Sequence, residues 1–183
     1  MFNFIFSFDN MKNNRRKFLQ TTGLAATGLF FFPRFSLSNS SIENETPEKI
    51  KPSRLKAGDT VAITSPAGAL WDDGKTVASF TQVLQKLGFT VIHGSSLVKR
   101  HGYFAGTDEE RAKELNEFFA HPEVRGIFCA KGGWGSARLL DKLDFKLIKN
   151  NPKMLVGFSD ITTLLNALHA KTGLVTDRKS TRL

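Results

Sequence analysis

The stretch that decides the predicted fold is Val156-Gly157-Phe158-Ser159-Asp160-Ile161-Thr162-Thr163. The apolar run from Met154 to Val156 is typical of a short buried strand, and Gly157 breaks it. Beyond the break, apolar residues recur at helical spacing, at Ile161, Leu164, Leu165 and Leu168. The stretch therefore predicts a strand that passes through a tight turn directly into a helix.

Ser159 lies in that turn and is a candidate nucleophile. A strand-to-helix turn exposes a hydroxyl group, and the first N–H groups of the helix point at any negative charge that forms there. The backbone N–H of Asp160 is the natural first oxyanion donor, and we expect the Asp160 side chain to cap the turn. The last glycine of the G-x-S-x-G nucleophile elbow is absent, so this motif is only partly matched.

Strand and helix patterns alternate along the body of the chain. Thr107-Asp108-Glu109-Glu110 is a capping box that predicts the start of one helix. The alternation of strand and helix patterns predicts an α/β fold of the flavodoxin or Rossmann-like class, with a parallel sheet and helices on both faces. The expected strands are 60–64, 89–92, 127–130, 154–156 and one beginning at 174–175, and the expected helices are 77–87, 107–119, 136–143 and 161–169.

Three loops follow predicted strands at one edge of this sheet: 65–70, 131–136 and 157–160. Ligands of open α/β sheets bind beyond the carboxyl ends of the strands. We therefore expect these three loops to converge and to form the site.

The loop Lys131-Gly132-Gly133-Trp134-Gly135-Ser136 lets the backbone approach a ligand closely. Three interpretations remain open: phosphate binding at a helix N-terminus, oxyanion donation toward Ser159 from Gly132 and Gly133, or a tight turn. The loop lacks the spacing of a Walker loop or a G-x-G-x-x-G fingerprint, which counts against phosphate.

Two side chains beside this loop are candidate substrate contacts. Trp134 either stacks on a substrate or covers the core. Arg138 either binds a carboxylate in bidentate fashion or is simply solvated.

The histidines and the single cysteine are weak candidates for catalytic residues. None of the four histidines makes a convincing general base, since His169 lies about 15 Å along the helix from Ser159 at roughly 1.5 Å per residue. Cys129 lies in an apolar run, which predicts a buried core residue.

The chain termini differ from the body in charge. Residues 1–37, 38–176 and 177–183 carry net charges of +4, +3 and +2, so the near-neutral body gives no reason to expect nucleic acid binding. Arg15-Arg16-Lys17-Phe18-Leu19, followed by a short apolar run, resembles a twin-arginine export signal spanning 1–37, with Met11 as the expected true start. The polar composition of residues 38–53 predicts a linker. Residues 177–183 have no apolar pattern and are predicted to be a non-native tail.

Four ordered segments resemble the LD-carboxypeptidases, the murein tetrapeptide carboxypeptidase family of serine peptidases, over residues 54–176. They are Leu55 to Ala67, Tyr103 to Arg111, Lys131 to Leu140 and Val156 to Thr162. Arg-Gly-Gly-Tyr-Gly is commoner in the family where this chain has Lys131 and Trp134.

The resemblance implies that Ser159 is the nucleophile, with an oxyanion hole from the backbone of Asp160 and the Gly132-Gly133 turn. It implies release of the terminal D-alanine from a murein tetrapeptide, without metal or cofactor, or cleavage of a peptidyl-nucleotide antibiotic as in some relatives. The family's Glu and His follow in a C-terminal domain absent from this sequence, so we expect the 183-residue chain to be inactive alone. A non-catalytic ligand- or wall-binding module is the alternative.

The same interpretation predicts export to the periplasm or cell envelope, with transient membrane contact through the signal. It also predicts a muropeptide partner and a homodimer of the full-length protein.

Overall fold

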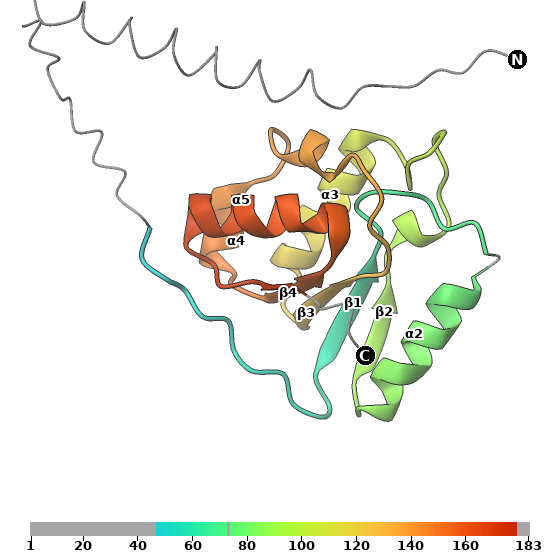
Figure 1. Cartoon of the computed structure of the whole chain (residues 1–183). Helices are drawn as coiled ribbons and strands as arrows, with labels where there is room; N and C mark the ends of the chain where they lie inside the picture. The colour runs from blue at the N-terminus through green and yellow to red at the C-terminus, as the bar shows by residue number, and fades with distance from the viewer. Residues whose placement is uncertain (1–46, 73, 179–183) are drawn as a thin grey trace, which may run out of the picture. The chain divides into compact units, whose positions relative to one another are not determined.

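In a computed structural model of the protein, the structure describes residues 47–72 and 74–178. The predicted export signal, most of the predicted linker and residues 179–183 lie outside these described residues. Five parallel strands form one sheet in the order β2-β1-β3-β4-β5 (Figure 1), which confirms the predicted flavodoxin-like class. The strands are β1 (Thr60–Thr64), β2 (Thr90–His93), β3 (Val124–Cys129), β4 (Met154–Gly157) and β5 (Asp177–Arg178).

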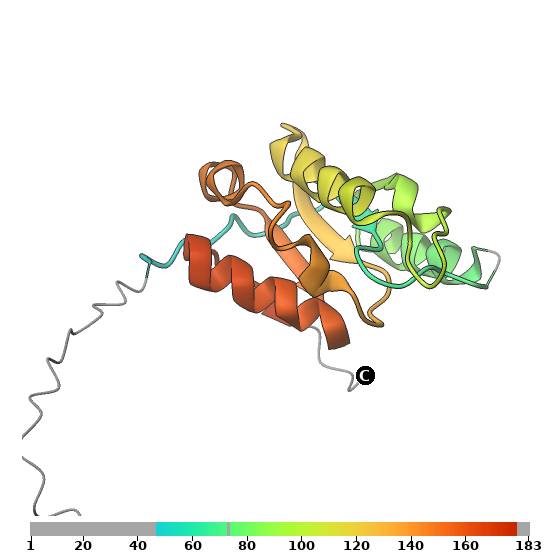
Figure 2. The same ribbon diagram turned by 90° about the horizontal axis from the view of Figure 1, so that it is seen from above.

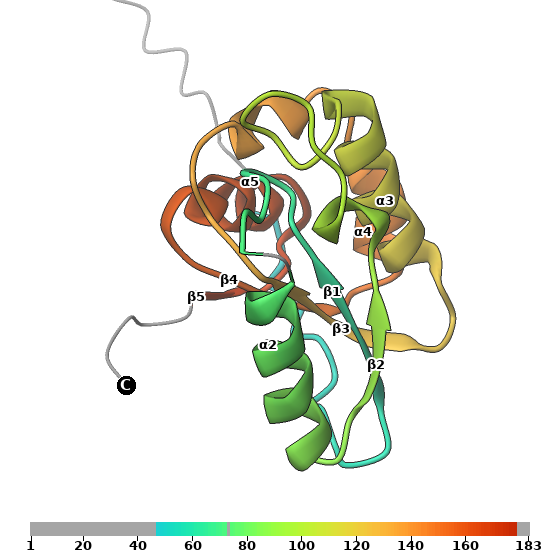
Figure 3. The same ribbon diagram turned by 90° about the vertical axis from the view of Figure 1, so that its right-hand side faces the viewer.

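Helices cover both faces of the sheet, but unequally. In the sheet, β2 lies on one side of β1, and β3, β4 and β5 follow one another on the other side. The order of the strands along the chain therefore reverses direction after β2. Because crossovers are right-handed, this reversal places α2 on one face and the later helices on the opposite face, as Figures 1 and 3 show. Figure 2 shows α3 and α5 over the same side of the sheet. The helices are α2 (Lys75–Lys86), α3 (Asp108–Ala120), α4 (Phe145–Asn150) and α5 (Thr162–Thr172).

Each face of the sheet has its own hydrophobic cluster, because alternate residues of a strand point to opposite faces. The larger cluster joins Ala62, Ile127 and Leu155 to the apolar sides of α3, α4 and α5. The smaller cluster joins Val61 and Ile63 to α2. The larger cluster contains Cys129, as predicted, and burial raises the pKa of its thiol to about 12.

The predicted capping box at α3 is confirmed. The Thr107 side chain accepts a hydrogen bond from the Glu110 N–H, and the Glu110 carboxylate accepts one from the Thr107 N–H. Three acidic residues in the first turn also complement the positive end of the helix dipole.

Short elements differ from the sequence expectations. The predicted helix at 136–143 is a 3₁₀ turn, η3 (Ser136–Leu139), and the six-residue α4 was not predicted. The Asp144 side chain caps α4 by accepting from the Leu147 N–H, but six residues are too few to show a helical period.

The last strand begins later than predicted. Leu174 pairs with Ile50 instead of β4, and β5 is formed by Asp177 and Arg178, which the sequence placed in the tail. Gly173 ends α5 with a positive φ of 79° and directs Leu174 against the segment before β1. The domain thus extends to Arg178, and Ile50 of the predicted linker is hydrogen-bonded to it.

A buried carboxylate links three elements behind the sheet edge. Glu114 of α3 is 6% exposed, and its Oε1 accepts hydrogen bonds from Thr64 Oγ1 at 2.6 Å and Ser96 Oγ at 2.5 Å. Its Oε2 accepts from Ser95 Oγ and from the Ser96 N–H, both at 2.9 Å. Four donors therefore satisfy both oxygens, which a buried carboxylate requires.

Among the described residues, no helix is long and apolar enough to span a bilayer.

We predict that Glu114→Gln lowers the free energy of unfolding by about 2–4 kcal/mol, because its amide would present donors to groups that are themselves donors. Urea unfolding followed by circular dichroism measures the loss. The control is Glu117→Gln on the same helix, where the side chain is 63% exposed and a change within about 0.5 kcal/mol is expected. Equal losses in the two variants would contradict the structural role of Glu114.

Candidate active site

The three predicted loops converge at the carboxyl edge of the sheet, as expected. The Gly68 N–H donates to Gly132 O at 3.2 Å, which joins the first loop to the second. Ser136 Oγ donates to Asp160 O at 2.8 Å, which joins the second loop to the third. Lys131 Nζ donates to Ala69 O at 2.6 Å, so the loops are held together by polar contacts as well as by proximity.

Ser159 is the strained first residue of the 3₁₀ turn η4 (Ser159–Ile161), which leads from β4 into α5. Its φ is 56°, and among the described residues it is the only non-glycine residue with a positive φ. A left-handed conformation costs an L-residue about 1–2 kcal/mol, and such strain concentrates at functional sites. The residue is exposed, so the turn presents its hydroxyl to solvent.

Gly132 packs directly against Ser159. A Cβ atom placed on Gly132 would lie 2.9 Å from Ser159 Cβ and 3.3 Å from Ser159 Oγ. No side chain fits at this distance, so the absence of one at position 132 lets the two loops touch. The sequence indicated a close backbone approach here, and the structure shows that the partner is the candidate nucleophile.

The backbone of the Gly132-Gly133 bend and that of Asp160 both lie next to Ser159. The Gly132 carbonyl accepts a hydrogen bond from Gly68, and a trans peptide directs the following Gly133 N–H the opposite way. The Asp160 N–H lies at the start of η4, where an amide has no intrahelical acceptor. Donation by Gly132, Gly133 and Asp160 to an oxyanion stays a prediction, but the structure brings all three next to Ser159.

The Asp160 side chain does not cap its own turn, contrary to expectation. No side chain caps η4, and Asp160 Oδ2 instead accepts a hydrogen bond at 2.8 Å from the Ser136 N–H. That N–H belongs to the first residue of η3, the helix start that the phosphate interpretation of the glycine loop requires. Since a carboxylate of the chain already occupies this donor, the phosphate interpretation loses its main contact.

The structure adds Arg111 to the residues that support the site. In the sequence it is only the last residue of the segment from Tyr103 that resembles the family. This α3 residue is fully buried, and its guanidinium group donates to Pro66 O at 2.5 Å, Gly106 O at 3.2 Å and Gly135 O at 3.4 Å. It also pairs with Asp108. Two of the three site loops are therefore tied to one cation, a tertiary contact that no local sequence signal reveals.

Trp134 stands on the surface and does not cover the core. It is 54% exposed, stacks on Tyr103 with ring centroids 5.7 Å apart and meets Phe104 edge-on at 4.7 Å. Tyr103 lies over the glycine loop, because a Cβ on Gly133 would lie 2.5 Å from its hydroxyl oxygen. The two rings form an aromatic wall, defined as Tyr103 and Trp134, beside the loop that touches Ser159.

Arg138 already has a carboxylate partner within the chain. Its Nε lies 3.1 Å and 2.8 Å from the two oxygens of Asp108, and its Nη2 lies 2.7 Å from Oδ2. Hydrogen bonding to Arg138 is the main reason why the pKa of Asp108 is lowered. The prediction that Arg138 binds a substrate carboxylate stays untested, and the structure gives it a competing interaction.

In the part of the chain that the structure describes, no hydrogen bond joins a histidine to Ser159. His93 Nε2 pairs with Thr81 Oγ1 at 2.8 Å, and His169 Nδ1 pairs with Leu174 O at 3.1 Å. The same residues contain no group of three or more His, Cys, Asp or Glu side chains arranged to hold a metal ion. Within the described residues, the site thus combines a serine with neighbouring backbone amides and has no histidine hydrogen-bonded to that serine.

A strained serine between a parallel strand and a helix, flanked by backbone amides, is the nucleophile arrangement of serine hydrolases on α/β sheets. Residues 61–177 match the family described as LD-carboxypeptidase N-terminal domain. The chain belongs to this family, whose members are serine peptidases.

Named relatives agree with this assignment. A probable murein peptide carboxypeptidase of Bacillus subtilis is 44% identical over 126 residues, which are 69% of this chain and 39% of the relative. The microcin C7 self-immunity protein MccF of Escherichia coli is 38% identical over 123 residues, 67% of this chain and 37% of the relative. The solved structure of MccF in complex with aspartyl sulfamoyl adenosine superposes with a TM-score of 0.66 at 36% identity, covering 69% and 38% of the two chains. The chain therefore spans about two fifths of the length of these relatives.

We predict that Ser159→Gly raises the free energy of unfolding by about 0.5–1 kcal/mol. Glycine removes the left-handed strain of about 1–2 kcal/mol, and its larger unfolded-state entropy offsets part of this gain. Ser159→Ala is the matched control, since alanine keeps the strain and should leave stability within about 0.5 kcal/mol. Denaturant unfolding of both variants provides the measurement, and a glycine variant no more stable than the alanine variant would argue against a strained turn.

Proposed function

We propose that the chain supplies the nucleophile and the oxyanion donors of a serine LD-carboxypeptidase that releases the terminal D-alanine from murein tetrapeptides. The observation that carries the proposal is the contact between the strained Ser159 and the Gly132 bend, with 2.9 Å between Ser159 Cβ and a Cβ placed on Gly132. This contact supports the proposal because a carbonyl group bound at Ser159 would lie close to the backbone of the Gly132 bend.

In the proposed reaction, Ser159 Oγ attacks the carbonyl carbon of the L,D-peptide bond while its proton passes to a general base. The carbonyl oxygen becomes an oxyanion, which accepts hydrogen bonds from the amides at Asp160 and at Gly132-Gly133. Collapse breaks the C–N bond, and the D-alanine amine takes the proton as it leaves. Water then hydrolyses the acyl-serine by the same steps, releasing the shortened peptide and restoring Ser159.

We propose that the general base lies outside the described residues, in which no histidine is hydrogen-bonded to Ser159. The resemblance assigns a Glu and a His to the C-terminal domain of the family, and the matched relatives extend well beyond the region shared with this chain. We propose that a domain of this kind completes the triad. A serine without its base retains very little activity.

The aromatic wall of Tyr103 and Trp134 is the proposed substrate contact beside the nucleophile. Exposed, stacked aromatic rings suit a flat or ring-shaped apolar surface, and a muropeptide or a nucleoside would each offer one. Arg138 remains a proposed carboxylate contact, with only the donors that Asp108 leaves available.

Cleavage of a peptidyl-nucleotide is the second candidate activity. It is favoured by the similarity to MccF, whose solved structure contains aspartyl sulfamoyl adenosine. A binding module without catalysis is the third candidate and would use the same aromatic wall.

The proposed site of action is the cell envelope. The twin-arginine pattern at Arg15-Arg16 supports export to the periplasm or cell envelope, with transient contact of the signal with the membrane. A murein substrate fits that compartment. Homodimer formation by the full-length protein is part of the same proposal.

The test is a chimaera in which residues 61–177 replace the matched region of the Bacillus subtilis relative. We expect it to release D-alanine from a purified murein tetrapeptide, measured by chromatography. Ser159→Ala should reduce the rate at least 10³-fold, because the hydroxyl group makes the new bond. The control is Lys113→Ala on α3, where the side chain is 77% exposed and the rate should stay within twofold.

Other results would select other candidates. Cleavage of a peptidyl-sulfamoyl adenosine with no D-alanine release would select the second activity. Tetrapeptide binding without turnover, unchanged by Ser159→Ala, would select the binding module.

A further inference from the structure

A pocket of about 390 Å³ lies between the segment after the first site loop, the start of the glycine loop and the first turn of α2. Its lining residues are Leu70, Trp71, Asp72, Thr76, Ala130 and Lys131. The proposed reaction uses none of these side chains. The pocket is therefore a separate feature at the edge of the candidate active site.

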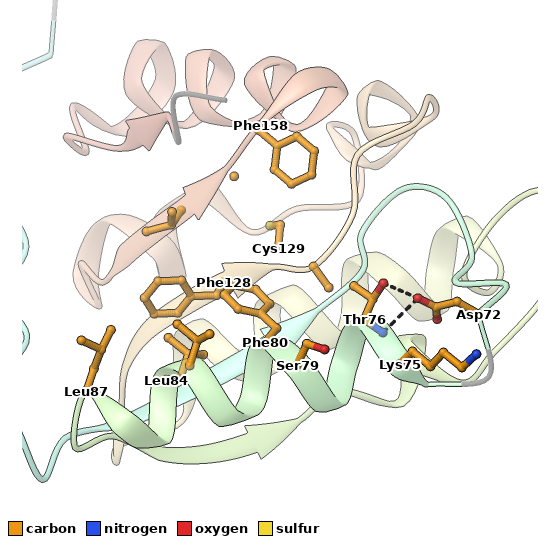
Figure 4. A pocket seen from close by; sticks show the side chains of 14 residues that line it. Asp72, Lys75, Thr76, Ser79, Phe80, Leu84, Leu87, Phe128, Cys129 and Phe158 are labelled. Atoms are coloured by element: carbon orange, nitrogen blue, oxygen red, sulfur yellow. Dashed lines mark hydrogen bonds between the residues drawn. The ribbon is translucent and has the colours of Figure 1, made fainter. Parts of the chain in front are cut away.

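Asp72 contributes a carboxylate oxygen that lacks a partner. Its Oδ2 accepts hydrogen bonds from the hydroxyl and N–H groups of Thr76, which hold the carboxylate against α2 (Figure 4). Its Oδ1 is the one buried side-chain oxygen or nitrogen atom without a hydrogen-bond partner in the part of the chain that the structure describes. Hydrogen bonding by the Thr76 hydroxyl lowers the pKa of Asp72, so this carboxylate is charged at neutral pH. A buried carboxylate oxygen requires a donor, and a ligand that carries one would satisfy it.

Lys131 contributes an ammonium group with donors to spare. Its Nζ donates to Ala69 O at 2.6 Å, which fixes the half-buried side chain, but an ammonium group has three donors. Among the described residues, no carboxylate forms an ion pair with Lys131, whereas Arg111 and Arg138 both pair with Asp108. Lys131 is thus a cation that can receive an acidic group of a ligand.

The two opposite charges line the same pocket without pairing with each other. Their charged atoms therefore lie farther apart than the roughly 4 Å of an ion pair. Asp72 would repel a purely anionic ligand, and Lys131 would repel a purely cationic one. A ligand with one charge of each sign would form a charge-assisted hydrogen bond with each of them.

The apolar part of the pocket is small. Leu70 and Ala130 are 7% and 9% exposed and lie beside the charged groups. Trp71 adds an aromatic ring, which is held by the Arg100 guanidinium group at 4.8 Å from its centroid. This surface suits a side chain of one or a few carbon atoms.

We propose that this pocket binds a small free α-amino acid as its zwitterion, with the ammonium group on Asp72 and the carboxylate on Lys131. The groove drawn in Figure 4 adjoins the pocket, since both are lined by Asp72, Thr76 and Ala130. Phe158, the residue before Ser159, lines that groove as well. An amino acid bound here would therefore lie near the candidate nucleophile without occupying it.

The assignment rests on the two charges and not on the proposed reaction, which only suggests alanine as the probe. Binding to the chain can therefore fail while D-alanine release by the chimaera succeeds, and the reverse can also occur.

The test is an NMR titration of the full chain with D-alanine and with L-alanine. We expect saturable binding of at least one enantiomer, with a Kd of about 1 mM or lower. Alaninamide of the same configuration lacks the carboxylate, and propionate lacks the ammonium group. Each should bind at least about tenfold more weakly, because each loses one charge-assisted hydrogen bond.

Two variants assign the contacts. Asp72→Asn keeps the shape of the side chain and Lys131→Met keeps its length, and each should weaken alanine binding at least about tenfold. Circular dichroism checks that both variants fold. The matched control is Lys86→Met, an exposed lysine at the end of α2 that does not line the pocket, and binding should change less than about twofold.

Three results would overturn the proposal. The first is the absence of saturable binding of either enantiomer in the millimolar range. The second is equal binding of propionate or alaninamide, which would mean that only one of the two charges recognises the ligand. The third is alanine binding that is unchanged in both folded variants, which would place the amino acid elsewhere.

Discussion

The site depends on one buried cation. Arg111 reaches from α3 to the backbone carbonyls of Pro66, Gly106 and Gly135, and so fixes the loops after β1 and β3 from behind. A fully buried guanidinium group is costly unless its donors are satisfied, and here carbonyl groups and Asp108 satisfy them. Gly135 lies on the loop that contacts Ser159 through Gly132, and Pro66 lies on the loop that contacts Gly132 through Gly68. Arg111 therefore supports from α3 the two loops that pack beside the candidate nucleophile.

Strain at Ser159 is held in place by its surroundings. A left-handed serine persists only when neighbouring contacts over-determine it. Gly132 packs against it on one side, and Ser136 holds Asp160 through two hydrogen bonds on the other. The tight packing of Gly132 and the exposed hydroxyl group of Ser159 are thus two results of the same arrangement.

The sequence predicted the architecture because its signals are local and periodic. The capping box at Thr107 and the strand-to-helix turn at Ser159 each specify their own element, and the rule for parallel sheets brings the three loops to one edge. It could not predict the tertiary polar contacts of Arg111 and Glu114, since each joins segments that are far apart in the chain. Asp177 and Arg178 pair with β4, and the sequence does not reveal this because a two-residue strand has no period. The sequence predicted that Asp160 caps its own turn, but its carboxylate accepts a hydrogen bond from the Ser136 N–H in another loop.

The direction of the Asp160 carboxylate has an electrostatic consequence. Asp160, whose amide is the proposed donor to an anion at Ser159, also carries a negative charge of its own, and two like charges close together repel. The Asp160 carboxylate accepts a hydrogen bond from the Ser136 N–H of the neighbouring loop. This N–H lies at the start of η3, where the helix dipole is positive and favours a negative charge. The turn can therefore expose a backbone N–H group on one side while its own carboxylate is held by a hydrogen bond to the neighbouring loop.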